Sequence, residues 1–417
     1  MSTGEPTGST LQFADSRLPG SPVAQGYGSL VPYGALCFAY FGSLGLFNPY
    51  APLWFQSLGF STLAIGAIAS LQSWTRVVVP YGWSWIGDRW HHGARRVELL
   101  RVATVLITLA SLGLLVFREW WALTVVVVLI FLANAAVMPI AEAVMAQRLS
   151  TPQGLDYGRY GRVRMWGSLG FIVAVSLFGV LLELTGIAAL PWLAVAMFAL
   201  LGVAAWRLPR QTAPAAAPHP STEGSVWRVL RRPVVAWFFA GVFFTVLAHT
   251  SLYAFLSLYL DALGYGKSAV GALWAVAIAV EIGFFWSQGH WFARWNTHNW
   301  LVAAALVSVL RFAAMAAFGG SWWLLVLTQS LHAVTFAAQH AACISMINEH
   351  FPAALRGRGQ ALYTMLGYGL SGVLGGVAGG AISQRWGFAA VFAAAAVVAV
   401  AATLCCWRCR SLALRRD

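Results

Sequence analysis

Charged and titratable side chains stand inside long apolar segments of this chain. They are Arg76, Glu142, Glu281 and Arg311 well inside such segments, Arg164 at the start of another, and His249, His332 and His340. An ionisable group in an apolar segment is costly unless it is paired or has a function, and histidine titrates near physiological pH. Groups of these types bind charged solutes and carry protons, so their positions predict a polar site inside an apolar frame.

Four of these charges repeat one pattern, in which a Glu on one apolar segment is followed by an Arg on the next. Glu142 precedes Arg164, and Glu281 precedes Arg311. If the members of each pair meet, no charge is left buried without a partner. A pair of this kind can be a structural staple alone. Taken together with the three His, the pairs favour a polar cavity that holds coupling groups.

The frame that must position these groups is a set of membrane-spanning helices. The chain has 417 residues, of which 59% are hydrophobic and 9% charged, whereas a soluble domain averages about 25% charged. A hydrocarbon core of about 30 Å takes about 20 apolar residues per helix. The apolar runs predict twelve spans, at 30–56, 61–86, 97–117, 121–147, 162–184, 188–206, 234–260, 267–290, 299–318, 322–347, 359–383 and 387–407.

The distribution of basic residues sets the orientation of these spans. Of the 26 basic residues, 25 are Arg, and they stand in small groups between the apolar runs. That is the positive-inside pattern of a membrane protein rather than the basic face of a nucleic-acid-binding domain. Placing both termini in the cytoplasm puts 21 of the 26 on the cytoplasmic side. Residues 1–28 are polar and lack the features of a signal peptide, so we expect a cytoplasmic tail there.

The chain divides into two halves that resemble each other. A Pro/Ala-rich cytoplasmic linker at 207–233 separates a six-helix bundle at 29–206 from a second at 234–407, and a cytoplasmic tail follows at 408–417. The sequences LGFSTLAIGAI and LGYGKSAVGAL, which begin at Leu58 and Leu263, share five of eleven residues at an offset of 205. Duplication of a six-helix unit explains this likeness, and many transporters place a substrate site between two such halves.

Glycines are concentrated in the eleventh predicted span. Gly372, Gly376 and Gly380 are spaced four apart, and so are Gly375 and Gly379. Each set lines one stripe of a helix and lets a neighbouring helix approach closely. The stripes serve either static packing or a surface over which the two bundles slide, and both interpretations stay open.

The loop after the second span carries a charged motif. It reads Gly87-Asp88-Arg89 and then Gly93-Ala94-Arg95-Arg96, which resembles the loop between helices 2 and 3 of the major facilitator superfamily with two residues inserted. The resemblance implies the fold of that superfamily, twelve transmembrane helices in two bundles with pseudo-two-fold symmetry. It also implies a cytoplasmic conformational latch made by Asp88, Arg89, Arg95 and Arg96.

A second stretch, YGRVRMWGSLGF from Tyr160 to Phe171, resembles the start of helix 5 in the lactose permease group of proton symporters. In that group the second Arg of the motif binds substrate, and an aromatic residue seven positions later stacks on it. The matching residues here are Arg164 and Phe171. Glu142 lies in a segment that resembles the helix 4 region whose Glu partners that Arg.

The second half resembles the same group at three charged positions and departs from it at two. Glu281, Arg311 and His332 fall where that group keeps a Glu, an Arg and a His on helices 8, 9 and 10. Thr335 stands where the symporters have a Glu that is central to proton release, and Gln329 stands where they have a Lys. Proton coupling in this chain therefore cannot use that carboxylate.

The resemblance that covers most of the chain is to the phenylpropionate permease group of the same superfamily. It is carried by Asp156-Tyr157-Gly158, by the segment from Ser268 to Trp274 and by Leu331-His332. It implies a monomeric transporter of the bacterial inner membrane that takes up an aromatic carboxylate such as 3-phenylpropionate with a proton. The proton gradient is then the energy source, with no other cofactor, no metal and no nucleic acid. Alternatives are a sugar or nucleoside symporter and a drug/proton antiporter.

An enzyme is the competing class of function, and the spacing of the titratable residues argues against it. His249, His332 and His340 lack the His-Glu-x-x-His spacing of a metal hydrolase. We therefore expect a transporter and not an enzyme.

These resemblances assign roles on the substrate side of the site. Arg164 is expected to hold the anionic end of the substrate, and Glu142 to orient Arg164 when substrate is absent. Phe171 and Trp166 are expected as aromatic walls, and Asn48 as a polar edge. Arg76 has no evident partner, so it either contacts an anionic substrate or has a structural role.

The proton side of the site is expected in the second half. Glu281, Arg311 and His332 form the candidate relay, and His249 and His340 are either alternatives or packing residues. A carboxylic acid in a dry site holds its proton more tightly than in water, and a nearby cation weakens that hold. A substrate-linked rearrangement could switch such a group, as a symporter requires.

Overall fold

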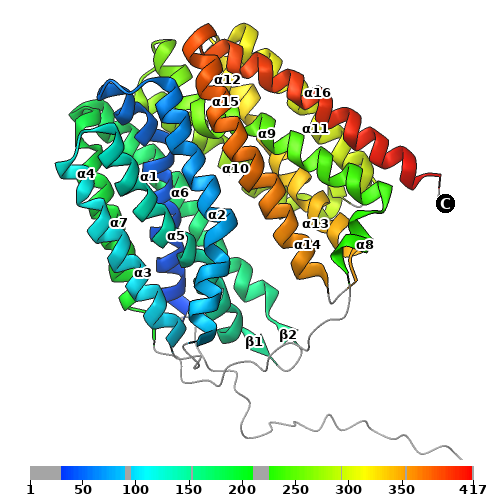
Figure 1. Cartoon of the computed structure of the whole chain (residues 1–417), viewed down its shortest axis with the longest axis horizontal. Helices are drawn as coiled ribbons and strands as arrows, with labels where there is room; N and C mark the ends of the chain where they lie inside the picture. The colour runs from blue at the N-terminus through cyan, green and yellow to red at the C-terminus, as the bar shows by residue number, and fades with distance from the viewer. Residues whose placement is uncertain are drawn as a thin grey trace, which may run out of the picture.

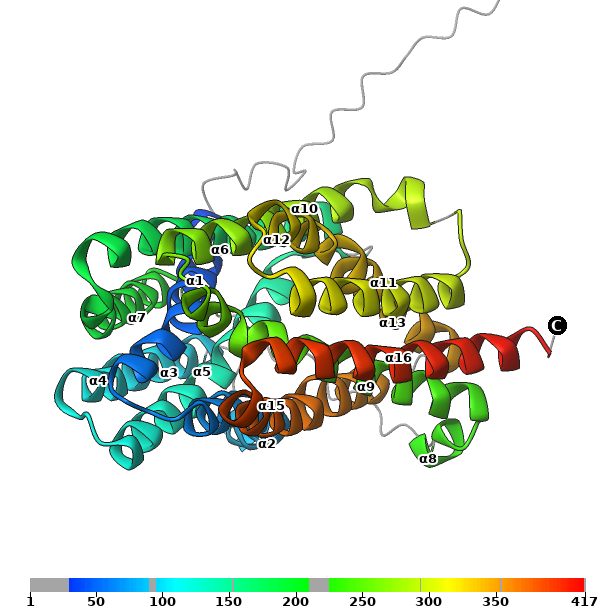
Figure 2. The same ribbon diagram turned by 90° about the horizontal axis from the view of Figure 1, so that it is seen from above.

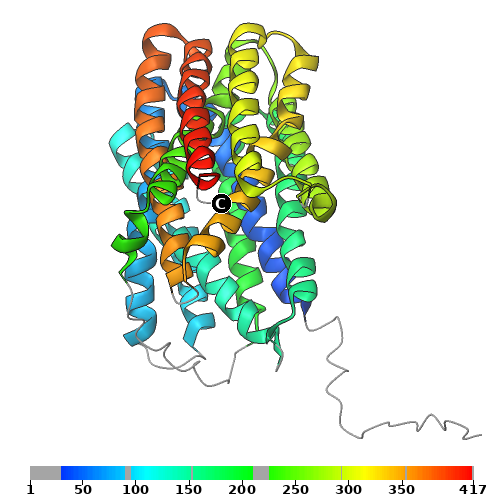
Figure 3. The same cartoon turned by 90° about the vertical axis from the view of Figure 1, so that its right-hand side faces the viewer.

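The computed structural model describes residues 30–89, 95–151, 154–209, 225–292, 294–352 and 355–415. The long helices run along one common direction (Figure 3) and form two bundles that lie side by side (Figure 1). The first bundle contains α1 (Val31–Ser57), α2 (Thr62–Arg89), α3 (Arg95–Ser111), α4 (Gly113–Val116), α5 (Trp120–Arg148), β1 (Ser150–Thr151), β2 (Gly154–Leu155), α6 (Tyr157–Thr185), η2 (Ile187–Ala189) and α7 (Leu190–Trp206).

The second bundle follows residues 210–224, which lie outside the described part of the chain. It contains α8 (Val226–Leu230), α9 (Pro233–Ala262), α10 (Lys267–Phe292), α11 (Thr297–Phe318), α12 (Trp322–Ser330), η3 (Ala333–Ala338), α13 (Gln339–His350), α14 (Arg356–Leu362), η5 (Tyr363–Leu370), α15 (Ser371–Trp386) and α16 (Phe388–Ala413). The tenth and eleventh predicted spans are thus each composed of α-helix with a π-helical segment, η3 in one and η5 in the other.

The fold class predicted from the sequence is confirmed as an all-helical membrane protein. In the described residues, nine helices are long and apolar enough to cross a membrane. The predicted spans 30–56, 61–86 and 322–347 are helical too, as α1, α2 and α12 to α13, but they do not belong to that set. The count of twelve spans therefore stays a prediction. The last helix continues beyond its predicted end at 407 to Ala413, because Cys409 is buried and its Sγ lies 3.3 Å from the carbonyl of Val234 on α9.

The repeated sequence motif builds the same turn in both halves. Gly59 ends α1 and Gly264 ends α9, each in the left-handed region with φ of 84° and 83°, which a residue with a side chain seldom adopts. The amide of Phe60 donates to the Phe55 carbonyl at 3.1 Å, and that of Tyr265 donates to the Leu260 carbonyl at 2.9 Å. Both turns are therefore helix terminations of the Schellman type, and the repeat encodes them.

The two bundles meet along a seam that three pairs of helices form. Seen from above (Figure 2), α6 lies against α10 along one edge, α2 lies against α15 along the other, and α1 meets α9 between them. At the α2–α15 crossing a Cβ on Gly376 would overlap the Ser70 hydroxyl, and a Cβ on Gly380 would press on the backbone of Thr62. Glycine here allows the two helices to touch through their backbones.

The two glycine stripes have different partners. Gly372 faces Ser73 of α2 across the seam, like the rest of its stripe, whereas Gly375 faces Thr250 and Gly379 faces Phe255, both on α9 of its own bundle. The first stripe therefore belongs to the surface between the bundles, and the second serves packing within one bundle.

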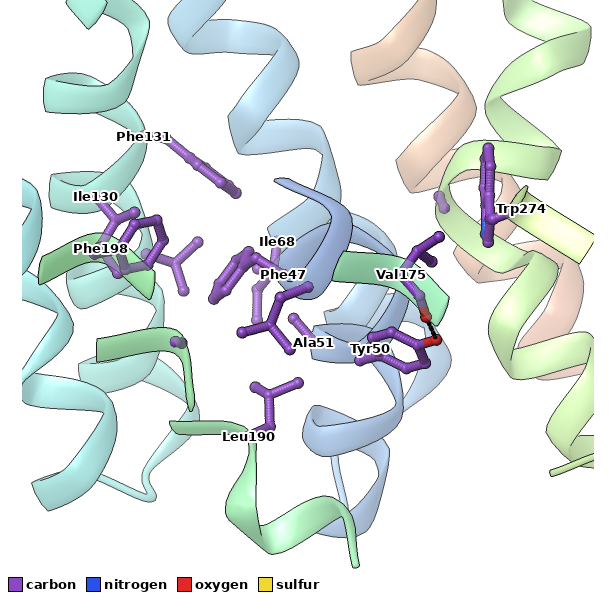
Figure 4. Close-up of a cluster of buried hydrophobic side chains, with 14 of the residues drawn as sticks. Phe47, Tyr50, Ala51, Ile68, Ile130, Phe131, Val175, Leu190, Phe198 and Trp274 are labelled. Carbon is purple, nitrogen blue, oxygen red and sulfur yellow. Dashed lines mark hydrogen bonds between the residues drawn. The ribbon is translucent and has the colours of Figure 1, made fainter. Parts of the chain in front are cut away.

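Hydrogen bonds join the bundles at the end that carries the two repeated turns, which we call the closed end. Thr62 donates to the Gly380 carbonyl at 3.3 Å, and Ser70 donates to the Val373 carbonyl at 3.1 Å. The hydroxyl of Tyr50 lies 2.6 Å from the Val175 carbonyl (Figure 4) and 3.4 Å from that of Lys267.

A carboxylate completes this contact from the end of α6. Glu183 accepts hydrogen bonds from the amides of Lys267 and Ser268, the second at 3.3 Å. These are the first residues of α10, whose amides have no acceptor within their own helix. An anion is favoured at this position by the helix dipole. A residue of the first half therefore caps a helix of the second half.

The apolar core runs through this end of the molecule. Phe47 of α1 packs among side chains of α2, α5 and α7, including Ile68, Phe131 and Phe198 (Figure 4). The same continuous cluster of buried side chains includes Trp274 of α10. The closed end is thus sealed by packing as well as by hydrogen bonds.

Candidate functional site

A cavity of about 390 Å³ lies between the two bundles, with walls from both halves. Its polar lining comprises Asn48, Gln72, Ser73, Arg164, Ser168, Thr250, Glu281 and His332. Its aromatic lining comprises Phe41, Phe47, Phe55, Phe131, Phe171, Tyr253, Trp274, Phe336 and Tyr368. A largely aromatic pocket with a few convergent polar groups is the usual form of a small-molecule site.

Arg164 enters this cavity from the first half, and the local sequence explains how. Asp156 caps α6 by accepting a hydrogen bond from the Arg159 amide at 2.9 Å. Further along α6, Gly167 leaves room for the Arg164 side chain beside the helix. A Cβ at Gly167 would lie 2.9 Å from Nη1 of Arg164. The guanidinium carbon lies 4.2 Å from the centre of the Phe41 ring, a cation–π contact.

The structure also brings Arg164 and Glu142 together. Nε of Arg164 lies 3.9 Å from Oε1 of Glu142, and the two side chains are 36% and 45% exposed. This separation is too long for a hydrogen bond, and an ion pair with this exposure is weak. The guanidinium therefore keeps donors with which it can bind a second anion. Glu142 is not among the residues that line the cavity, and its role in orienting Arg164 stays a prediction.

The second half contributes Glu281 and His332 to the cavity. Nε2 of His332 lies 3.8 Å from Oε2 of Glu281, and the side chains are 2% and 17% exposed. Arg164 of the first half lines the same cavity as Glu281 of the second half, so a cation and an acid from the two halves face one space.

Arg311 does not meet Glu281 directly, which corrects the pairing predicted from the sequence. Its fully buried guanidinium instead donates to Nδ1 of His332 at 3.2 Å, to Oγ1 of Thr335 at 2.8 Å and to Oε1 of Gln329 at 3.0 Å. His332 therefore stands between the Arg and the Glu. The two residues that depart from the symporter pattern, Gln329 and Thr335, are neutral acceptors for the two terminal nitrogens of this buried cation, while among the described residues its Nε has no acceptor.

The contact with Arg311 fixes the tautomer of His332. A guanidinium has only donors, so Nδ1 of His332 must be the acceptor. In the neutral ring the proton then sits on Nε2, the nitrogen that faces Glu281. A second proton, on Nδ1, would remove that acceptor and place two cations 3.2 Å apart. His332 is thus arranged to present an N–H to the Glu281 carboxylate.

His249 and His340 occupy different surroundings from His332. His249 is buried, its Nδ1 lies 2.8 Å from the Thr245 carbonyl, and its ring packs edge-on against Phe312. Nδ1 of His340 lies 2.9 Å from the Tyr363 hydroxyl, which lies 3.2 Å from that of Tyr368 at the cavity wall. His249 is therefore part of the core, whereas His340 is joined to the cavity by two hydroxyls.

The remaining predicted site residues fall into three groups. Phe171 and Asn48 line the cavity as expected. Trp166 does not: half of its surface is exposed, and its ring lies against Gly34 of α1, so the expectation of an aromatic wall there is wrong. Arg76 lies on α2, but its side chain is outside what the structure describes.

The predicted conformational latch stays a prediction. Asp88 and Arg89 are the last residues of α2, and Arg95 is the first of α3, but residues 90–94 and these three side chains lie outside the described part of the chain. Arg96 is exposed.

The sequence did not single out several residues that the structure places at the site or the seam. Phe41 stacks on Arg164, and Tyr253 and Trp274 line the cavity from the second half. Glu183, which caps α10, lies at the end of an apolar span where a charge is unremarkable. Of these residues, only Trp274 could have been found from the sequence, because it directly follows the repeated motif that marks equivalent positions in the two halves.

Comparison with known proteins places the chain among transporters. Residues 30–394 match the MFS_1 like family. Over 382 residues, 88% of this chain and 94% of the relative, it is 32% identical to a probable 3-phenylpropionic acid transporter of Escherichia coli (strain K12). Over 361 residues, 85% of this chain and 88% of the relative, it is 27% identical to a maltose permease of Geobacillus stearothermophilus.

Solved structures agree on the fold. The crystal structure of the nucleoside transporter NupG matches with a TM-score of 0.74 at 17% identity, covering 91% of this chain and 98% of that one. The POT family transporter PepTSo also matches with a TM-score of 0.74, at 12% identity, covering 93% and 98%. At such low identity these likenesses concern the fold alone.

Proposed function

Because the chain belongs to the MFS_1 like family of membrane transporters, we propose that it takes up an aromatic carboxylate such as 3-phenylpropionate together with a proton. The observation that carries the proposal is the cavity between the halves, where Arg164 stands among aromatic side chains opposite Glu281 and His332. A guanidinium binds a carboxylate through paired hydrogen bonds, and the rings provide contact for an aryl group. The relative described as a probable 3-phenylpropionic acid transporter supports this substrate class.

The proton in this proposal is carried by Glu281. His332 presents Nε2–H to the carboxylate, while its other nitrogen is held by Arg311. In the empty site the positive charge of Arg164 acts on Glu281 across the cavity. A substrate carboxylate on Arg164 cancels that attraction, so the bound anion and a neutral, protonated Glu281 favour each other. Substrate and proton then bind, and leave, as a pair.

The transport cycle exposes this site to one side of the membrane at a time. With both termini in the cytoplasm of a bacterium, the closed end faces outward across the inner membrane, and the structure is the state that loads or unloads toward the cytoplasm. The opposite state requires the α2–α15 and α6–α10 contacts to separate, with the bundles moving as units. The protein is proposed to act as a monomer, since one chain supplies both walls of the cavity.

Uptake into proteoliposomes tests the proposal. Purified protein is reconstituted, a proton gradient that is acid outside is imposed, and labelled 3-phenylpropionate inside is measured. Protein-free vesicles serve as the control, because a protonated aryl acid crosses lipid unaided. Saturable uptake above that background, abolished by a protonophore, is the expected result. Saturable uptake that the protonophore leaves unchanged would remove proton coupling from the proposal.

A sugar carrier is the second candidate, and one feature of the cavity favours it. Nε2 of Gln72 lies 3.4 Å from Oδ1 of Asn48 in the cavity wall, an amide pair of the kind that binds hydroxyl groups. The maltose permease at 27% identity points the same way. Labelled maltose and a nucleoside in the same vesicle assay decide between the candidates, since only the substrate accumulates.

A further inference from the structure

Three aromatic side chains form a continuous surface across the seam, which we call the aromatic bridge. Phe171 of α6 meets Trp274 of α10 edge-on, with ring centres 6.3 Å apart. On its other side Trp274 stacks on Tyr253 of α9, with centres 6.1 Å apart and planes within 16°. All three line the cavity. The bridge therefore offers a substrate ring both a face and an edge, from both halves of the molecule.

Trp274, the middle member, is held by packing rather than by hydrogen bonds. Its side chain is 6% exposed, and among the described residues its Nε1 has no acceptor. Buried indole N–H groups usually find a partner. With no polar partner to fix it, the ring can shift to pack against a bound aryl group. It lies beside the α6 segment that carries Val175 (Figure 4), one helical turn from the close contact of Gly271 with that segment.

The internal repeat shows that Trp274 has no aromatic counterpart at the matching position of the first half. At the offset of 205 that relates the halves, the counterpart of Trp274 is Ala69, which also lines the cavity. Ala69 lies on α2 and Trp274 on α10, at opposite edges of the seam. The indole ring is therefore particular to the edge where α10 meets α6.

Arg164 and the bridge are close enough for one small acid to contact both. The Arg164 guanidinium lies beside Gly167, and Phe171 follows four residues later, which is about 6 Å along the helix axis. Arg164 and all three members of the bridge line the same cavity. A carboxylate held by Arg164 can therefore place its aryl ring against the bridge.

We propose that Trp274 is a specificity-determining residue that contacts the aryl ring of the substrate, so that the site discriminates aryl acids from aliphatic acids of similar length. This inference rests on the proposed function, since it takes an aromatic carboxylate as the ligand. It adds a residue from the second half to a substrate site whose anion-binding group comes from the first half.

The test measures equilibrium binding of 3-phenylpropionate and of heptanoate, an aliphatic acid of similar length, to the full chain in lipid nanodiscs by calorimetry. The proteins are wild type, Trp274→Phe, Trp274→Ala and a control, Trp286→Ala. Trp286 lies on the same helix, is 86% exposed and does not line the cavity. The comparison of the two acids on wild type needs no variant, so it is informative even if Trp274→Ala folds poorly.

We expect wild type to bind 3-phenylpropionate about tenfold or more tightly than heptanoate. Trp274→Ala should weaken binding of 3-phenylpropionate by about tenfold, the size of one lost aromatic contact with its buried area, and change that of heptanoate less. Trp274→Phe and Trp286→Ala should stay within about threefold of wild type. Equal wild-type affinity for the two acids, or unchanged affinity of Trp274→Ala for 3-phenylpropionate, would overturn the inference while leaving the transported class intact. Wild-type protein that does not bind 3-phenylpropionate would overturn the proposed substrate class itself.

Discussion

Glu183 provides the sharpest perturbation of the conformational cycle, because it lies outside the cavity and touches only the closed end. Its carboxylate accepts hydrogen bonds from the first amides of α10, at Lys267 and Ser268. When the closed end opens, α6 and α10 part and these amides pass to water. Substituting Glu183→Gln removes the charge, and Glu183→Ala removes the cap, while the walls of the cavity stay unchanged.

The size of the effect follows from the exposure of this contact. Loss of a helix N-cap destabilises by about 1 kcal/mol, and the interaction of a carboxylate with the helix dipole adds about 0.3–1 kcal/mol at most. Because Glu183 is exposed, solvent screens the charge and makes the dipole contribution small. The total loss is therefore about 1 kcal/mol, the value for the cap alone. About 1 kcal/mol is roughly a fivefold change in the ratio of the two conformations. Glu183→Ala should therefore shift this ratio about fivefold toward opening, and Glu183→Gln by less.

Pulsed electron resonance between two spin labels measures the ratio directly. Ser61→Cys and Gln384→Cys place labels at exposed positions on opposite halves of the closed end, and the five native cysteines are buried. Glu119→Gln is the matched control, since Glu119 is exposed at the start of α5 and, among the described residues, its side chain makes no hydrogen bond or ion pair across the seam. The long-distance population should grow in Glu183→Ala and not in the control. A distance distribution identical to wild type in Glu183→Ala would refute the reasoning.

Three further predictions follow from the same geometry. Arg164→Gln should weaken binding of an aryl acid by about tenfold or more but leave its neutral amide analogue unaffected, as calorimetry would reveal; equal loss for both ligands would contradict an anion-binding role. Gly376→Val should hold the closed end apart and expose the buried α2 position Ile65→Cys to a membrane-impermeant thiol reagent. Gly283→Val, where a new side chain meets open space, should not, and equal labelling in both would argue against the stripe. His332→Gln should reduce proton-driven uptake by about tenfold while substrate affinity changes less than about twofold, and an equal loss in both would assign His332 to substrate binding instead.

The helices were predictable because each is a long apolar run with clear ends. The predicted span 299–318 became α11 (Thr297–Phe318), and 121–147 became α5 (Trp120–Arg148). The π-helical segments η3 and η5 were not predictable, since each adds a local change of winding within an apolar run. The segment η3 directly follows His332, and η5 contains Tyr363 and Tyr368. Both therefore lie at residues of the candidate site, and π-helical turns are frequent at functional sites.

The candidate site was predictable in its residue types but only partly in its contacts. Glu142 and Arg164 do approach each other, whereas Arg311 reaches His332 instead of Glu281. In a membrane protein both the lipid-facing and the cavity-facing sides of a helix are apolar, so the sequence pattern does not fix how the helix is rotated. For the same reason Trp166 and Trp274 look alike in the sequence, although only Trp274 lines the cavity.

The central claim is that one carboxylate in the cavity, Glu281, carries the proton that drives uptake. Proteoliposomes containing Glu281→Gln test it most directly, because the same vesicles can be assayed for accumulation and for exchange. We expect that this variant no longer accumulates labelled 3-phenylpropionate under a proton gradient, yet still exchanges internal unlabelled for external labelled substrate. Accumulation at the wild-type level by Glu281→Gln would contradict it.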